Sequence, residues 1–333
     1  MKTNRREFLT GAFAAGIAAG VSSFVRAEET TTDQTGSAEN IVFKRKELSE
    51  LKKKLDRRGK IGGVELSRII LGGNPFGGWA HCRDLSYVNT LVKAYNTHDK
   101  IMETLGMAEA AGINAFLTNP ALAPYYRDYV KLGGKMKFIS DCGGEGGPAL
   151  QARKSVEAGA AMVYIHGFGL EEFIAKDDWR GIKRELDEMR KLGVPVGIGA
   201  HAFGSLKYCT EHDLIPDFWM KTIHPTDYWS FQKTAKDAGE GEPGAEARGW
   251  HDNCWCRDPE ALAAWFAKRD EPWIAFKTMA AGAVPPEKAL PFAFEHGADY
   301  VCMGMMDFQI VDDINIATAA FDRGFPKRTR AWH

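Results

Sequence analysis

The feature that most limits the possible folds of this chain is a short apolar run that recurs eight times between residues 69 and 303. Each run is rich in Ile, Val, Leu, Phe or Ala, and a polar side chain or a glycine follows closely. Uninterrupted apolar runs of this length are typical of strands that are buried on both faces of a parallel sheet. The predicted strands are 69–72, 114–118, 137–140, 160–165, 195–199, 218–223, 273–276 and 299–303.

Helical stretches alternate with these strands. The predicted helices are 99–112, 126–132, 147–158, 177–192, 205–212, 258–268, 286–297 and 311–323. Repeated strand–helix–strand units predict a parallel sheet, and eight units close into a single-domain (β/α)8 TIM barrel over residues 41–333. An open doubly wound sheet is the alternative, but no Gly-x-Gly-x-x-Gly motif joins a first strand to a helix.

Further segments are expected to surround the barrel. Residues 43–58 have leucines at helical spacing and predict a charged outer helix, and 60–67 predict a hairpin that turns at Gly62 and Gly63. Long connections follow the first strand (79–98) and the sixth strand (222–257), so both belong to the catalytic face of a barrel.

Composition and the first residues predict an exported protein with a small-molecule ligand. A net charge of -1 excludes the basic surface that nucleic acid or an anionic membrane requires. Residues 1–27 combine Arg5 and Arg6 with an apolar region too short for a stable membrane anchor, and end in an Ala-x-Ala-like cleavage site. They predict a twin-arginine signal peptide, a flexible tether over 28–40, and a periplasmic or secreted location, where the six cysteines can form disulfides.

Several segments resemble the aldo-keto reductases. Residues 63–78 are similar to that family's opening hairpin and first strand, 163–166 to its fourth strand, and 276–282, Gly304 and Asn315 to its last two units. The resemblance implies a barrel and carbonyl reduction with NADPH by an Asp, Tyr, Lys and His tetrad.

The tetrad positions carry over only in part. The family's histidine falls on His166, whereas its aspartate falls on Leu117 and its lysine on Asp141, and the nearest tyrosines, Tyr125 and Tyr126, come a few residues late. A carboxylate in place of a lysine raises the pKa of a neighbouring tyrosine, which is opposite to what the tetrad requires.

The polar strand ends suggest other chemistry. Asp141, His166 and His201 follow three successive strands, and neighbouring strands lie about 4.8 Å apart, so their side chains can converge. One carboxylate and two imidazoles suit a divalent metal such as zinc, manganese or iron. Alternatively, each histidine is an ordinary hydrogen-bonded residue.

Two more polar residues follow later strands. His224 is a candidate fourth ligand or general base, and Lys277 can form a Schiff base, hold an anion or pair with Asp141. Substrate contacts are expected from Asn74, Asn119, Trp229 and Trp255. Trp79, Trp229, Trp250 and Trp255 all lie in the two long connections, where indole rings either stack on a sugar or pack the loops together.

The main functional hypothesis is an enzyme that acts on a sugar-like or polyol substrate by metal- or acid/base-assisted proton transfer, as an isomerase, epimerase, lyase or hydrolase. Asp141, His166, Lys277 and His224 are the expected catalytic residues, with Asp141, His166 and His201 as metal ligands. One alternative is an NADPH-dependent oxidoreductase of the aldo-keto reductase type. The other is a carbohydrate-binding barrel without catalysis.

Overall fold

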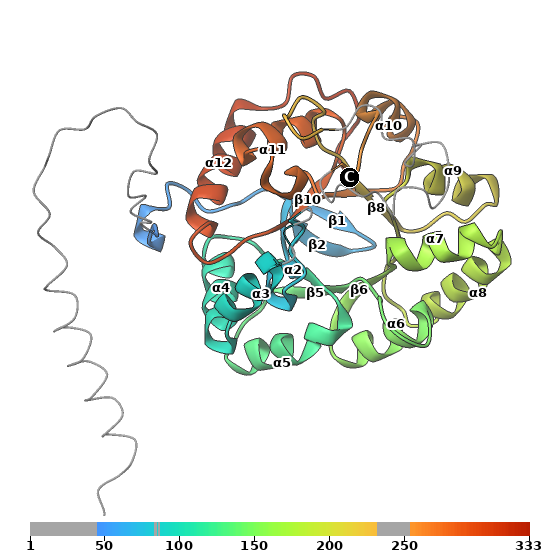
Figure 1. Cartoon of the computed structure of the whole chain (residues 1–333), viewed down its shortest axis with the longest axis horizontal. Helices are drawn as coiled ribbons and strands as arrows, with labels where there is room; N and C mark the ends of the chain where they lie inside the picture. Colours follow the sequence, from blue (N-terminus) through green and yellow to red (C-terminus); the bar gives the residue numbers. More distant parts are fainter. Residues whose placement is uncertain (1–44, 83–84, 86, 232–253) are drawn as a thin grey trace, which may run out of the picture. The chain divides into compact units, whose positions relative to one another are not determined.

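The computed structural model describes residues 45–82, 85, 87–231 and 254–333, and within them eight parallel strands form a closed barrel (Figure 1). The predicted signal peptide and tether lie outside the described residues. Chain order is kept around the barrel, and β10 closes it by pairing with β3, with Gly304 opposite Gly72. The strands are β3 Ile69–Gly72, β4 Ala115–Thr118, β5 Lys137–Ser140, β6 Ala160–Ile165, β7 Val196–Ala200, β8 Phe218–Thr222, β9 Trp273–Phe276 and β10 Tyr300–Gly304. The predicted barrel is confirmed.

Helices form a ring outside the strands (Figure 1). The crossover helices are α4 His98–Ala110, α5 Ala123–Lys131, α6 Pro148–Glu157, α8 Trp179–Arg190, α9 Phe203–Glu211, α10 Pro259–Phe266, α11 Pro286–Glu295 and α12 Ile310–Arg323. Three helices were not predicted: α2 Asn74–Gly77, α3 Tyr87–Tyr95 and α7 Gly167–Ala175. Short 3-10 turns occur at η1 Leu48–Glu50, η2 Pro120–Leu122 and η4 Ala280–Gly282.

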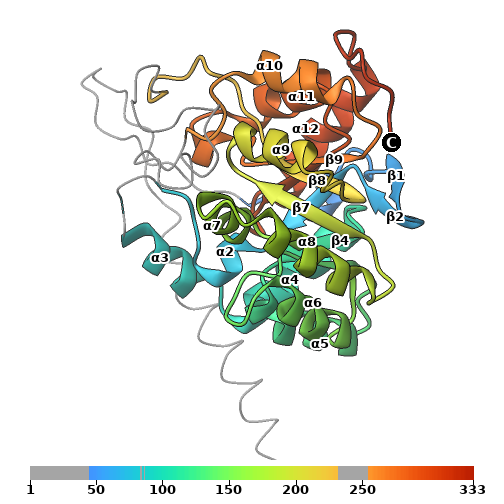
Figure 2. The same cartoon turned by 90° about the vertical axis from the view of Figure 1, so that its right-hand side faces the viewer.

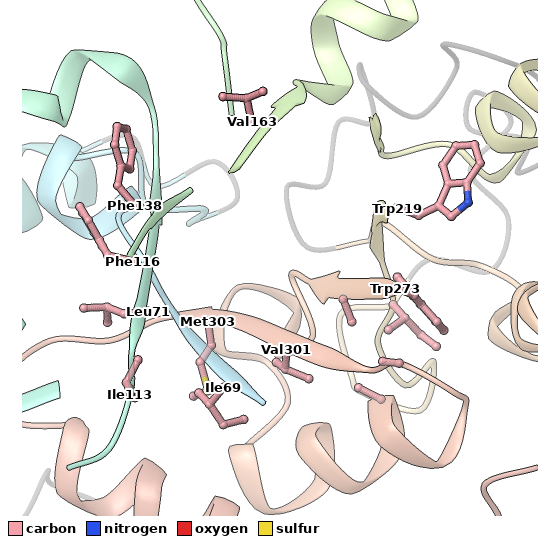
Figure 3. Packing of buried hydrophobic residues seen from close by; sticks show 14 of the residues in the cluster. Ile69, Leu71, Ile113, Phe116, Phe138, Val163, Trp219, Trp273, Val301 and Met303 are labelled. Carbon is pink, nitrogen blue, oxygen red and sulfur yellow. The ribbon is translucent and has the colours of Figure 1, made fainter. Parts of the chain in front are cut away.

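The apolar side chains of the strands form two layers because successive residues of a strand point to opposite faces. The outward layer packs between the strands and the helices, and includes Leu71, Phe116, Phe138 and Trp273 (Figure 3). The inward layer fills the barrel and includes Ile70. Burial on both faces accounts for the continuous apolar runs of the sequence.

The hairpin covers the end of the barrel at which the strands begin. It consists of β1 Arg58–Ile61 and β2 Val64–Ser67, and turns at Gly62 and Gly63, whose φ angles of 53° and 85° favour glycine. Ile61 and Leu66 are fully buried and pack among the inward layer. The helices α2 and α3 lie at the opposite end (Figure 2), so the hairpin leaves the other end as the mouth.

The predicted helix over 43–58 is wrong for the described residues, which contain the turn η1 and, at Arg58, the first residue of β1. Tertiary contacts overrule the helical spacing here: Leu55 is buried in the outward layer and its N–H donates to the carbonyl of Ala111, and the N–H of Lys52 donates to Asn315 Oδ1. These bonds hold the backbone in an irregular path.

Membrane and disulfide features can be assessed for the described residues. In that part of the chain, no helix combines the length and apolarity needed to span a bilayer. All six cysteines lie there, and none forms a disulfide. Cys302 is buried in β10.

Candidate active site

A cavity of about 550 Å³ opens at the mouth, where the carboxyl ends of the barrel strands meet. Seven of the nine predicted site residues line it: Asn74, Asn119, Asp141, His166, His201, Trp255 and Lys277. This convergence follows from the fold, since each residue lies at or just after the end of a strand, or in a loop of the same face.

The other two predicted residues, His224 and Trp229, are not among the lining residues. Trp229 is 82% exposed. The His224 ring is fully buried, with Nδ1 donating to the carbonyl of Pro225 and Nε2 accepting from the N–H groups of Trp255 and Cys256 at 2.7 and 2.9 Å. Burial lowers its pKa to about 4. Backbone groups occupy both ring nitrogens in this placement, and the prediction of His224 as a fourth ligand or general base stays untested.

His201 is paired with a buried carboxylate. Its Nδ1 lies 3.2 Å from Glu171 Oε2, while Glu171 Oε1 accepts from the N–H groups of His201 and Ala202 at 2.8 and 3.1 Å. These contacts lower the pKa of Glu171 against the opposing effect of burial. Burial also lowers the pKa of His201, to about 3, so the imidazole is neutral. Because ionised Glu171 can only accept, Nδ1 carries the proton and Nε2 keeps a lone pair.

His166 has the opposite arrangement of ring nitrogens. It is the N-cap of α7, and its Nδ1 accepts from the N–H of Phe168 at 3.3 Å. In the neutral ring the proton therefore lies on Nε2. The His166 and His201 rings are 5.9 Å apart between centroids. The cavity thus holds one imidazole with an accepting Nε2 beside one with a donating Nε2.

Asp141 is set by a sharp turn directly after β5. Cys142 has a left-handed φ of 50°, which brings the N–H of Gly143 to Asp141 Oδ1 at 2.8 Å, and Asn119 Nδ2 donates to the same oxygen at 2.9 Å. Burial raises the pKa of Asp141, partly opposed by His166. The carboxyl group can therefore hold a proton closer to neutral pH than an exposed aspartate.

The three predicted metal ligands all line the cavity. Across the described ranges, no group of three His, Cys, Asp or Glu side chains is placed to hold a metal ion. Each member is engaged elsewhere: Asp141 with Asn119, His166 with a backbone N–H and His201 with Glu171. The metal remains an untested prediction.

Lys277 follows β9 with a left-handed φ of 54°. Its Nζ lies 2.8 Å from His81 Nε2 and 3.5 Å from the centroid of the Trp255 ring, rather than against Asp141. Trp255 is held in turn by the bond from its N–H to His224. The ammonium group is thus fixed at the cavity wall by an aromatic face and an imidazole.

Neither Tyr125 nor Tyr126, the tyrosines nearest to the tetrad position of the aldo-keto reductases, is among the residues that line the cavity. Tyr126 donates to the carbonyl of Met136 and packs on Phe138, outside the barrel, and Tyr125 is also absent from the cavity wall. Tyr164 of β6 lines the cavity, and burial raises its pKa well above the usual value, with Asp141 adding to the shift. A phenol in this environment is a weak proton donor.

Sequence reasoning missed four cavity residues or their partners: His81, Tyr164, Phe168 and Glu171. His81 lies in a long connection without a pattern, and Tyr164 lies inside a predicted strand. Phe168 and Glu171 belong to α7, which was not predicted as a helix because Gly167 and Gly169, poor helix formers, lie in its first turn. The available signal was the capping position of His166, since a histidine before a helical stretch can accept from the first turn.

Comparison with solved structures shows that other proteins have a similar fold. A putative aldo-keto reductase from Pseudomonas aeruginosa has 17% identity and a TM-score of 0.53, and the match covers 82% of this chain and 99% of that chain. The chain has a TIM-barrel fold. An apo structure of Gox0644 has 11% identity and a TM-score of 0.50, with 83% and 94% covered. A truncated 3-deoxy-D-arabino-heptulosonate 7-phosphate synthase from Thermotoga maritima has 12% identity and a TM-score of 0.48, with 80% and 92% covered. No protein-family model and no curated protein matches the chain.

Proposed function

We propose that the mouth cavity catalyses proton transfer on a small sugar-like or polyol substrate, with His201 as base and His166 as hydrogen-bond donor. The observation that carries this proposal is the Glu171–His201 pair, buried beside His166 in the cavity wall. A carboxylate that holds Nδ1 fixes the ring with Nε2 unprotonated, and it offsets part of the cost that burial imposes on the imidazolium formed when Nε2 takes a proton.

The proton-transfer step needs a place for negative charge. When His201 removes a proton from a carbon next to a carbonyl, the charge moves to the carbonyl oxygen. The ammonium of Lys277 and the Nε2–H of His166 are the groups of the cavity wall suited to stabilise that oxygen. Asp141, with its raised pKa, is suited to return a proton to the substrate.

The cavity wall favours a polar ring with apolar faces. Trp79, Phe168 and Phe276 line it together with the amides Asn74 and Asn119. Aromatic faces pack on the C–H groups of sugars, and amides donate to and accept from hydroxyls. Trp255 contributes in another way, since Lys277 covers one face of its ring.

A nicotinamide-dependent reductase is less well supported by the geometry. Its proton donor needs a lowered pKa, whereas the pKa of Tyr164 is raised and Lys277 lies against His81. We also propose, from residues 1–27, that the protein acts outside the cytoplasm.

The direct test is hydrogen exchange in D2O, followed by NMR on a panel of aldoses, ketoses, uronates and polyols. Wild-type protein is expected to incorporate deuterium at a carbon next to the carbonyl of its substrate, and His201→Ala to lose this exchange. His98→Gln is the matched control, because His98 is exposed on α4 and bonded to Asp128.

Three other results are informative. Exchange that depends on added zinc, manganese or iron assigns the chemistry to a metal. Oxidation of NADPH with a carbonyl substrate, without deuterium exchange, replaces proton transfer by the reductase alternative. Saturable sugar binding without turnover in any assay leaves a binding protein, and the proposal fails.

A further inference from the structure

A second cavity, of about 570 Å³, lies at the end of the barrel opposite the mouth. Arg68 directly precedes β3, and Arg58 begins the hairpin, so both belong to the end where the strands start. Figures 1 and 2 both show the hairpin beside the C-terminal end of the chain. The wall contains five arginines and one tryptophan, here called the arginine basin: Arg57, Arg58, Arg68, Arg328, Arg330 and Trp332.

The arginine basin has more positive than negative charge. Its buried carboxylate, Asp299, is shared between Arg328 at 2.9 Å and Arg330, and also accepts from the N–H groups of Trp273 and His333. Among the basin arginines, the exposed Asp56 and Asp322 form ion pairs with Arg57 alone, at 3.7 and 3.8 Å, and both also contact Lys53. Glu65 and Asp56 act on Arg58 through longer-range electrostatic attraction.

Two of the arginines use backbone carbonyls where ion pairs would be expected. Arg58 donates to the carbonyls of Gly112 and Arg57, and Arg68 donates to the carbonyl of Asp299 and to a backbone oxygen of His333. Arg328 and Arg330 also donate to backbone carbonyls, in addition to their bonds to Asp299. Even with a carboxylate at His333, the wall keeps a surplus of guanidinium groups. Burial lowers the pKa of both Arg58 and Arg68, which shows that the surroundings disfavour their charge.

The basin also contains donors without an acceptor. The Nε atoms of Arg328 and Arg330 are buried, and neither has a hydrogen-bond partner. Both side chains are only 4% exposed. Trp332 fixes two of the guanidiniums, because Arg68 and Arg328 lie 4.7 and 3.7 Å from its ring centroid. A surplus of fixed charge with unused donors is costly unless an anion occupies the space.

We propose that the arginine basin binds a phosphate group, either as inorganic phosphate or as part of a small phosphorylated molecule. Guanidinium groups bind phosphate oxygens through paired charge-assisted hydrogen bonds. The volume exceeds that of one phosphate ion and leaves room for an attached organic group. The inference does not depend on the function of the mouth, since the two cavities share no lining residue.

The test is calorimetric titration of the full-length protein with inorganic phosphate and with glycerol 3-phosphate, at constant ionic strength in sodium chloride. Saturable binding is expected with wild type. Arg58→Gln is expected to weaken it roughly tenfold or more, because a charge-assisted hydrogen bond is lost. Arg57→Gln, at a more exposed position, serves as a second variant if Arg58→Gln does not fold.

Two controls locate the site. Arg184→Gln changes an exposed arginine of α8, and Lys277→Gln changes the mouth, and both are expected to keep the wild-type affinity. Tighter binding of the ester identifies a phosphorylated molecule as the ligand, and equal binding identifies the phosphate group alone. The proposal is overturned if neither compound binds saturably, if both basin variants bind as wild type does, or if Lys277→Gln abolishes binding.

Discussion

The buried His224 predicts that the protein loses stability in mild acid. The pKa of this ring is lowered to about 4 by burial, from an ordinary value of 6.5. Between these values the unfolded chain binds more protons than the folded chain, so the free energy of unfolding falls as pH is lowered through this window. Protonation of Nε2 also breaks the bonds from Trp255 and Cys256.

The magnitude follows from the two pKa values. A shift of 2.5 units corresponds to about 3.4 kcal/mol when the window has been crossed completely, and about 2 kcal/mol of this is lost by pH 5. His201, with a pKa of about 3, adds a similar loss. His224→Gln keeps an acceptor for the backbone but does not titrate. Its stability should therefore depend on pH less steeply than that of wild type, by about 2 kcal/mol between pH 7.5 and 5.

Guanidinium unfolding followed by tryptophan fluorescence at pH 7.5, 6 and 5 measures this difference. His98→Gln is the control: Asp99 and Asp128 raise the pKa of the exposed His98, so its removal should leave the acid loss intact or slightly larger. If wild type and His224→Gln lose the same free energy between pH 7.5 and 5, the assigned role of His224 is wrong.

Three further predictions concern catalysis, the core and export. Glu171→Gln should lower kcat for deuterium exchange by roughly 10²-fold with little change in KM, because His201 loses its orientation; an unchanged kcat contradicts the pair. Phe138→Ala should lower the unfolding free energy by about 3–5 kcal/mol in chemical denaturation, since the ring is fully buried between β5 and the helices; a loss below about 1 kcal/mol would mean that the core repacks. Changing Arg5 and Arg6 to Lys should keep the protein in the cytoplasmic fraction of a twin-arginine-competent bacterium; unaltered export removes the signal assignment.

The barrel was predictable because its signals are local and repeated. Each strand is buried on both faces, so each appears as an apolar run, and the residue that follows it must lie near the mouth. By this rule the sequence alone predicts that Asp141, His166 and Lys277 lie together, and all three line the mouth cavity.

The roles of the individual side chains could not be predicted from the sequence, because each role depends on which atoms the side chain contacts. His201 and His224 follow neighbouring strands and look alike in sequence, yet one pairs with Glu171 and lines the cavity while the other supports the backbone at Trp255. Glu171 lies on a helix that two glycines concealed. These differences arise from packing between distant segments, which periodicity does not encode.

The hairpin of β1 and β2 has a consequence for the movement of small molecules. In the described part of the chain, Ile61 and Leu66 pack among the inner side chains at the end where the strands begin, and the cavity lies at the opposite end, lined by Trp79 and Phe168 among others. In the proposed reaction, substrate enters and product leaves through the mouth, so product has to leave before the next substrate molecule can bind. Accumulated product should therefore compete directly with substrate for the same opening.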